Sequence, residues 1–199
     1  MLPTREEALK LIRDGLLFNP GPWGKHCLTA AHCAEKIASA CGDMDVEKAY
    51  ILGLLHDIGR KFGVRHLGHV SDGYRFMMSL GYDEAAKICL THSFNNHTVD
   101  EYIGKLDVSE EEMKMIKAEL ARTVYDDYDR LIILCDSLAM AEGFCILEKR
   151  LVDTTRRYGA FSFTVERWNH IFEIKAYFEK KIGRSIYELL PGIEQCIYQ

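Results

Sequence analysis

The chain has 199 residues, of which 25 are lysine or arginine and 30 are aspartate or glutamate, and its formal net charge is −5. Its 48% hydrophobic and 28% charged residues are typical of a folded globular protein and exclude an intrinsically disordered chain. The length favours one domain over residues 1–199. A mildly acidic chain has no net attraction to polyanions, so we expect neither a membrane nor a nucleic-acid duplex as partner, while a homo-oligomer stays open.

The cysteines and the N-terminal segment indicate a cytoplasmic protein. There are seven cysteines, an odd number, and no C-x-x-C pair. Six lie in apolar segments, as reduced core residues do, rather than in a disulfide framework. These six are Cys27, Cys33, Cys41, Cys89, Cys135 and Cys145. The segment MLPTREEALK lacks the apolar stretch of a signal peptide, and the longest apolar run, 131–141, is too short to span a membrane.

The predicted elements are helices throughout. Capping boxes, Thr4 with Glu7 and Ser109 with Glu112, indicate the start of two of them. Apolar periodicity and turn residues place the helices at about 4–13, 25–40, 45–59, 69–80, 83–92, 109–124, 128–141, 145–157 and 164–182. Alternating strand patterns with hairpin signals are absent. The sequence therefore predicts an all-α fold, a single compact multi-helix bundle.

Two histidines of the 25–40 helix face in opposite directions on a helical wheel. His26 shares its arc with alanine, cysteine and isoleucine side chains, whereas His32 shares the opposite arc with lysine and glutamate. We expect His26 to point into the core and His32 to be solvated. Taken alone, His26 also fits a core histidine bonded to a backbone carbonyl.

Two aspartates lie in unusually apolar segments. The helix AYILGLLHDIG ends in His56 and Asp57, and a buried carboxylate is costly unless it is paired or metal-bound. Capping of a neighbouring helix is the alternative for Asp57. Asp136 lies inside the apolar helix RLIILCDSLAMA, where it caps nothing and has no lysine or arginine three or four residues away. Its partner is either a metal ion or an arginine distant in sequence.

Three segments together carry a resemblance. They are the His26 helix with its small residues, GLLHDIGR at 53–60 and LCDSL at 134–138. In this order they resemble the HD-domain superfamily of metal-dependent phosphohydrolases, over about residues 23–141. The resemblance implies an HD-like metal-binding core there, with C-terminal helices at 145–190 packed on it. It also implies four metal ligands, of which His56 and Asp57 are the catalytic pair: His26, His56, Asp57 and Asp136. A thiolate ligand from Cys27, Cys33 or Cys135 is the alternative donor set.

Members of this superfamily with two metal ions carry additional histidines before the final aspartate. His69, four residues before Gly73, and His92 are similar to those positions and are the candidates for a second metal. Ser93 stands where two-metal members often have another histidine, and His97 is the nearest substitute. His66, in a basic loop, is expected to be a surface or substrate-facing residue.

The resemblance implies a divalent metal cofactor, one ion or two. Mixed histidine and carboxylate ligands suit Fe, Mn, Co, Ni or Zn better than Ca, and Mg stays a candidate. Such an ion activates water for attack on a phosphate ester or anhydride, and the implied partner is a small phosphorylated molecule, most simply a nucleotide. The alternative is a non-catalytic metal- or nucleotide-binding regulatory module of HD-like fold.

Basic residues near these segments are candidates for binding the substrate phosphate. Arg60 and Lys61 directly follow the His-Asp doublet, and Arg150 lies in the basic segment 148–158. The same segment contains Lys149, Arg156 and Arg157, and each basic residue taken singly also fits a solvated helix face. Asp127 or Asp129, about two turns before Asp136, could approach the metal site.

Overall fold

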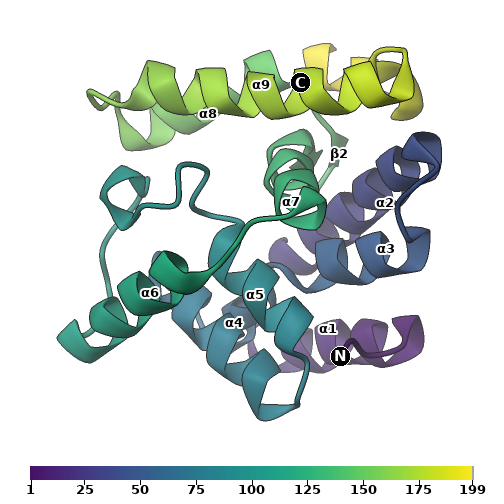
Figure 1. The fold of residues 1–199 in the computed structure, drawn as a ribbon. Helices are drawn as coiled ribbons and strands as arrows, with labels where there is room; N and C mark the ends of the chain where they lie inside the picture. Colours follow the sequence, from purple (N-terminus) through teal and green to yellow (C-terminus); the bar gives the residue numbers. More distant parts are fainter. Residues whose placement is uncertain (199) are drawn as a thin grey trace.

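The computed structural model describes residues 1–198, and its first half is a run of five α-helices (Figure 1). They are α1 (Arg5–Phe18), α2 (Trp23–Cys41), α3 (Val46–Leu55), α4 (Gly68–Ser79) and α5 (Asp83–Thr91). A 3₁₀ turn, η1 (Ile58–Phe62), joins α3 to the segment before α4.

The second half adds four α-helices, short 3₁₀ turns and one two-stranded hairpin. In chain order these elements are η2 (Val99–Glu101), α6 (Glu110–Arg122), α7 (Asp127–Leu138), β1 (Ala139–Met140), β2 (Gly143–Phe144), α8 (Leu147–Tyr158), α9 (Thr164–Ile182), η3 (Ile186–Leu189) and η4 (Ile193–Tyr198). The all-α prediction is confirmed.

The capping boxes begin their helices as predicted. The Thr4 hydroxyl accepts from the Glu7 backbone amide at the start of α1, and the Ser109 hydroxyl accepts from that of Glu112 at the start of α6. Helix ends were predicted less well: α1 continues to Phe18, five residues beyond the expected end. The helix expected to reach 59 ends at Leu55, before the doublet.

The prediction that one helix runs to 141 is wrong, and a short hairpin without a sequence signal follows the helix. Helix α7 ends at Leu138, and Ala139 pairs with Phe144 in an antiparallel ladder. Gly143 has a φ of 142°, a conformation that favours glycine, and closes the tight connection. The apolar residues after Leu138 are buried as a strand rather than as another helical turn.

Helix α7 lies in the middle of the bundle and carries one end of the candidate site. It packs against α2, α3 and α9, with α9 crossing above it in Figure 1. Its buried side chains lie on nearly all sides of the helix, as an all-round apolar helix predicts. They include Leu131, Ile132, Ile133, Leu134, Cys135 and Leu138. The same cluster of buried apolar side chains extends from Ala8 to Ile193.

Helices α2 and α3 are in backbone contact, because Gly53 has no side chain. A Cβ atom built on Gly53 would lie 2.9 Å from the Ala31 Cα and 3.0 Å from the Ala30 carbonyl oxygen. Real Cβ atoms do not approach a backbone so closely, so a larger residue would push the two helices apart. This close approach brings His26 on α2 next to His56 at the end of α3.

No helix within residues 1–198 combines the length and the apolar character needed to cross a bilayer. All seven cysteines are free, and six are buried while Cys41 is half-buried.

Candidate metal centre

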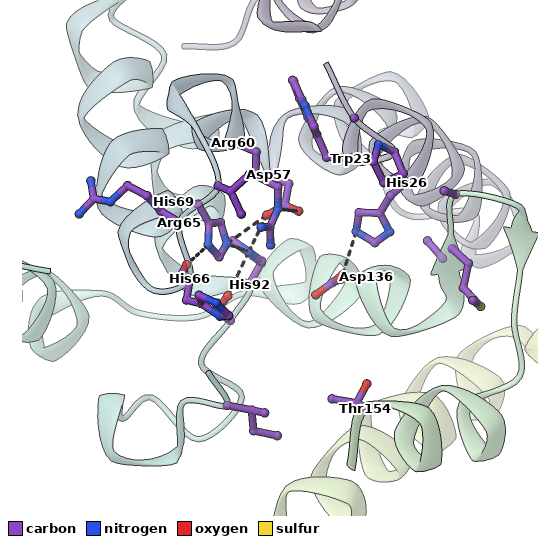
Figure 2. A pocket seen from close by; sticks show the side chains of 18 of the residues that line it. Trp23, His26, Asp57, Arg60, Arg65, His66, His69, His92, Asp136 and Thr154 are labelled. Carbon is purple, nitrogen blue, oxygen red and sulfur yellow. Dashed lines mark hydrogen bonds and ion pairs between the residues drawn. The ribbon is translucent and has the colours of Figure 1, made fainter. Parts of the chain in front are cut away.

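Six polar side chains from separate elements lie close together, and all of them except His56 line one cavity (Figure 2). They are His26 on α2, His56 at the end of α3, Asp57 before η1, His69 on α4, His92 at the end of α5 and Asp136 on α7. These are the residues expected from the sequence for the first metal site and for the second. The fold brings all of them together.

The first group consists of His26, His56 and Asp57, whose potential ligand atoms all lie within 4.8 Å of one another. The Nε2 atoms of His26 and His56 are 3.1 Å apart. Asp136 adjoins this group, because its Oδ1 lies 3.0 Å from the Nε2 of His26 and 3.8 Å from that of His56. This arrangement places a carboxylate on either side of the two imidazoles.

The second group consists of Asp57, His69 and His92, again with ligand atoms within 4.8 Å. Asp57 Oδ1 lies 3.0 Å from the Nε2 of His69 and 3.5 Å from that of His92. The two Nε2 atoms are 3.2 Å apart. Asp57 therefore belongs to both groups, and its carboxylate lies where one residue could bridge two ions.

Backbone carbonyls orient three of the four imidazoles. The Nδ1 of His56 lies 2.8 Å from the Gly53 carbonyl oxygen, and that of His92 lies 3.1 Å from the Ile88 carbonyl oxygen. The Nδ1 of His69 is bonded to the carbonyl of His66. A carbonyl can only accept, so each Nδ1 carries the proton and each Nε2 presents a lone pair to the site. Metal-binding histidines are held in this way.

The donor set fits a divalent cation. Asp57 Oδ1 is buried without a hydrogen-bond partner among the described residues, and it faces the lone pairs of His69 and His92. Three electron-pair donors at such short separations repel one another unless a cation lies among them. Histidine nitrogens with carboxylate oxygens are the ligands of Mn, Fe, Co, Ni or Zn. The residues present therefore match the metal that the sequence predicts.

The electrostatics of the site keep its carboxylates charged. Burial opposes ionisation of Asp57, but the Arg60 guanidinium holds the pKa of that carboxyl well below its usual range. Burial likewise opposes ionisation of Asp136, and the hydrogen bond from His26 lowers its pKa instead. Burial lowers the pKa of His56 to about 4. Ionised carboxylates and a neutral imidazole are the protonation states that metal binding requires.

Gly59 allows the doublet to lie against His69. A Cβ atom built on Gly59 would overlap the carbonyl oxygen of His69 and lie 2.6 Å from the Gly73 amide nitrogen. The glycine after the doublet thus lets η1 and α4 touch through their backbones. That contact carries the histidine of α4 to the carboxylate of Asp57.

The cavity above the site has a volume of about 690 Å³. This volume lies within the range of small-molecule binding pockets and is sufficient for a nucleotide. Its walls combine aromatic with basic side chains. They include Trp23, Tyr102, Tyr158, Arg150, Arg157 and Arg167.

Of the three residues expected to bind phosphate, two line this cavity. Arg60 lines it, although its guanidinium is already paired with Asp57. Arg150 lines it from α8. The prediction for Lys61 is not met, because its Nζ lies 3.9 Å from the Phe76 ring centroid and it is not part of the cavity wall. The direction of a side chain after the helix end depends on the packing of η1, which spacing alone does not determine.

The other basic residues of segment 148–158 divide between cavity and surface. Arg157 lines the cavity, whereas Lys149 donates to the Cys196 carbonyl and Arg156 is exposed.

Sequence reasoning missed Arg167, which lines the cavity from α9. Nothing in TVERWNH marks this arginine, because only the crossing of α9 over α7 brings it to the site.

The remaining histidines lie outside the two groups. His32 has a side chain 47% exposed, against 14% for His26, which confirms the directions that the helical wheel predicts. His97 stacks on Tyr125 and does not replace a histidine at position 93. His66 lines the cavity, in keeping with a substrate-facing residue.

Asp127 and Asp129 do not approach the site. Asp129 is buried at the start of α7, where it pairs with Lys87 and accepts from the Thr91 hydroxyl. Asp127 pairs with Lys181 on α9. Both carboxylates therefore stabilise the N-terminal end of α7. Asp129 does so through Lys87 and Thr91, and Asp127 does so through Lys181 on α9.

The thiolate alternative finds no support in the geometry. Within residues 1–198, neither group of potential ligands contains a cysteine. Burial raises the pKa of Cys27 and of Cys135 well above the usual value for a thiol. Both side chains are therefore neutral core residues at neutral pH.

Comparison with family models identifies the core that carries this centre. A model described as HD domain matches residues 23–141, the stretch that contains all six converging side chains. Comparisons with curated proteins and with solved structures returned no match. The helical fold, the doublet at the end of α3 and the final aspartate on α7 agree with the family match. The chain belongs to the HD-domain superfamily of metal-dependent phosphohydrolases.

Proposed function

We propose that this protein is a metal-dependent phosphohydrolase that cleaves a phosphate ester or anhydride bond of a nucleotide. The observation that carries the proposal is the pair of His and Asp groups that share Asp57 on the floor of a basic cavity. Purely structural histidines would have no reason to present their lone pairs to one another in a buried site.

In this proposal His26, His56, Asp57 and Asp136 hold one ion, and Asp57 with His69 and His92 holds a second. When bound, such ions supply an activated water and a Lewis acid for the phosphoryl oxygen. Asp57 lies between the groups and carries the charge common to both. His56 is oriented by the Gly53 carbonyl, so its Nε2 is directed at the reacting centre.

The cavity walls support a nucleotide as substrate. Arg60 holds Asp57 ionised at the floor, and Arg150 offers a guanidinium to a phosphate. Tyr102 and Tyr158 line the same cavity and provide aromatic surface for a base or sugar. A nucleotide would place its phosphate near these guanidinium groups and its base or sugar against the aromatic side chains of the same cavity.

The proposed activity is tested by assaying purified protein with added Mn²⁺ against three classes of bond. Suitable substrates are p-nitrophenyl phosphate, bis-p-nitrophenyl phosphate, and a set of nucleoside mono-, di- and triphosphates. We expect metal-dependent release of phosphate or nucleotide from at least one class, with loss of the activity in EDTA. Stable metal binding without turnover of any of them would instead identify a regulatory module.

The second metal group is tested by changing His69 and His92 together to alanine. Because Asp57, His26, His56 and Asp136 are untouched, we expect the first ion to stay bound while the second is lost. Hydrolysis should fall at least about 100-fold, since two-ion chemistry needs both positions. Metal content by mass spectrometry and turnover by phosphate release measure the two effects separately. His97→Ala, outside both groups, is the control, and full occupancy of both ions in the double variant would refute the second site.

A further inference from the structure

The last two long helices close one wall of the cavity although they lie outside the stretch that matches the family. Helices α8 and α9 follow residue 141 and pack on α7 (Figure 1). Thr154 of α8 lies across from Asp136 in Figure 2. The residues of this wall therefore lie outside the stretch that matches the family model.

Helix α8 presents a stripe of polar residues to the cavity. Arg150, Thr154 and Arg157 all line it, and their spacing of four and three residues places them on one face of the helix. The neighbouring face of the helix is anchored by the buried Leu147 and Leu151. This anchoring directs both arginines toward the cavity, with their Cα atoms about 10 Å apart along the helix axis.

The arginines on this wall lack carboxylate partners. Arg65, at the other side of the cavity, is paired with Asp72 and Glu112. By contrast, within residues 1–198 no ion pair involves Arg150, Arg157 or Arg167. Glu142 lines the rim but pairs with none of the three. Guanidinium groups directed into a cavity without a counterion favour a bound anion.

Arg167 lies at a different depth from the two arginines of α8. Its guanidinium donates to the carbonyls of Ser93 and Glu101. Ser93 directly follows His92, so Arg167 lies beside the second metal group. Burial lowers its pKa, and attraction to Asp136 opposes that effect. The wall therefore carries two cationic positions. Arg167 lies next to the metal groups, and Arg150 with Arg157 lies along α8.

We infer that the substrate carries two phosphate groups, one held by Arg167 over the His and Asp floor and the other by Arg150 and Arg157. This inference rests on the proposed function and narrows its substrate to molecules such as nucleoside diphosphates. A monophosphate would leave the cationic stripe of α8 without a counterion. Tyr102 and Tyr158 line the same cavity and offer aromatic surface to the organic part of such a molecule.

The test uses two adenosine analogues with carbon–phosphorus bonds that resist hydrolysis, one with a single 5′-phosphonate and one with a 5′-diphosphonate. Calorimetry on the Mn²⁺-loaded protein is expected to show the diphosphonate bound at least about tenfold more tightly, as for a charge-assisted contact. The variant with both Arg150→Gln and Arg157→Gln should lose this preference. Arg167→Gln should weaken the binding of both analogues.

The matched control is Arg156→Gln, which makes the same change of charge one residue away on α8. Its side chain is 80% exposed, so this variant should keep the preference. Circular dichroism verifies folding, and the single variants Arg150→Gln and Arg157→Gln replace the double variant if it does not fold. Equal affinities in the native protein, or a preference that persists without both arginines, would overturn the inference. The analogues are not hydrolysed, so this experiment measures binding alone. A protein that fails the hydrolysis assays can therefore still show or lack the preference for two phosphates, and the two proposals are tested separately.

Discussion

Replacing Asp57 with alanine is expected to remove bound metal and to abolish hydrolysis. Asp57 is the single residue common to both groups of potential ligands, and its Oδ1 is buried without another partner among the described residues. Its loss would leave His56, His69 and His92 without a shared anion and Arg60 without its ion-pair partner. A turnover decrease of about 1000-fold or more follows if several kcal/mol of charge stabilisation disappear. Metal analysis by mass spectrometry and a phosphate-release assay measure both effects.

Two further variants separate the metal effect from a loss of fold. Asp57→Asn keeps the shape of the side chain while removing its charge, and it should also lose most of the metal. Asp14→Ala removes an exposed carboxylate whose ion pair with Lys10 lies on the surface, so metal and activity should be retained. Thermal unfolding of all three compares their stability. Retention of full metal content by the Asp57→Ala protein would contradict the assignment of this residue.

The second large effect is expected at His26, in contrast to its neighbour on α2. His26→Ala should lose the ion of the first group, because the Nε2 of His26 lies between His56 and Asp136 at 3.1 and 3.0 Å. Metal affinity should decrease by at least about 100-fold, more than is typical when a residue behind a ligand is removed. Titration with Mn²⁺ or Zn²⁺ under a competing chelator gives the affinity.

His32→Ala provides the matched control on the same helix. Its side chain is largely exposed and contacts Glu35 at 3.3 Å, an interaction that contributes little to stability. Metal affinity and melting temperature should stay close to those of the unchanged protein. A metal-free His32→Ala protein beside a metal-loaded His26→Ala protein would reverse the assignment of the two histidines.

Local patterns in the chain were sufficient to predict the helical class and much of the site. Capping at Thr4 and Ser109 depends on residues three apart, so sequence reveals it directly. The orientation of His26 follows from helical periodicity alone. The apolar surroundings of Asp57 and Asp136 marked both carboxylates as groups in need of a cation, because burial of charge is costly wherever the chain folds. His69 and His92 rested on the resemblance, and the fold brings them to Asp57.

Other features depend on contacts between distant segments. The hairpin after Leu138 replaces the last expected turn of a helix, since its apolar residues can be buried equally well as strand or helix. Lys61 turns toward Phe76 instead of the cavity, a direction set by how η1 packs on α4. Arg167 reaches the site only because α9 crosses α7.

The sequence by itself therefore determined which side chains must be neutralised and on which helices they lie. Tertiary structure decided how they meet: Gly53 and Gly59 let backbones touch, and this contact brings the residues of α2, α3 and α4 around Asp57. The tertiary structure also decided which arginines face the cavity. The physical reason is that periodicity fixes the face of one helix, whereas the distance between two faces depends on the packing of every element between them.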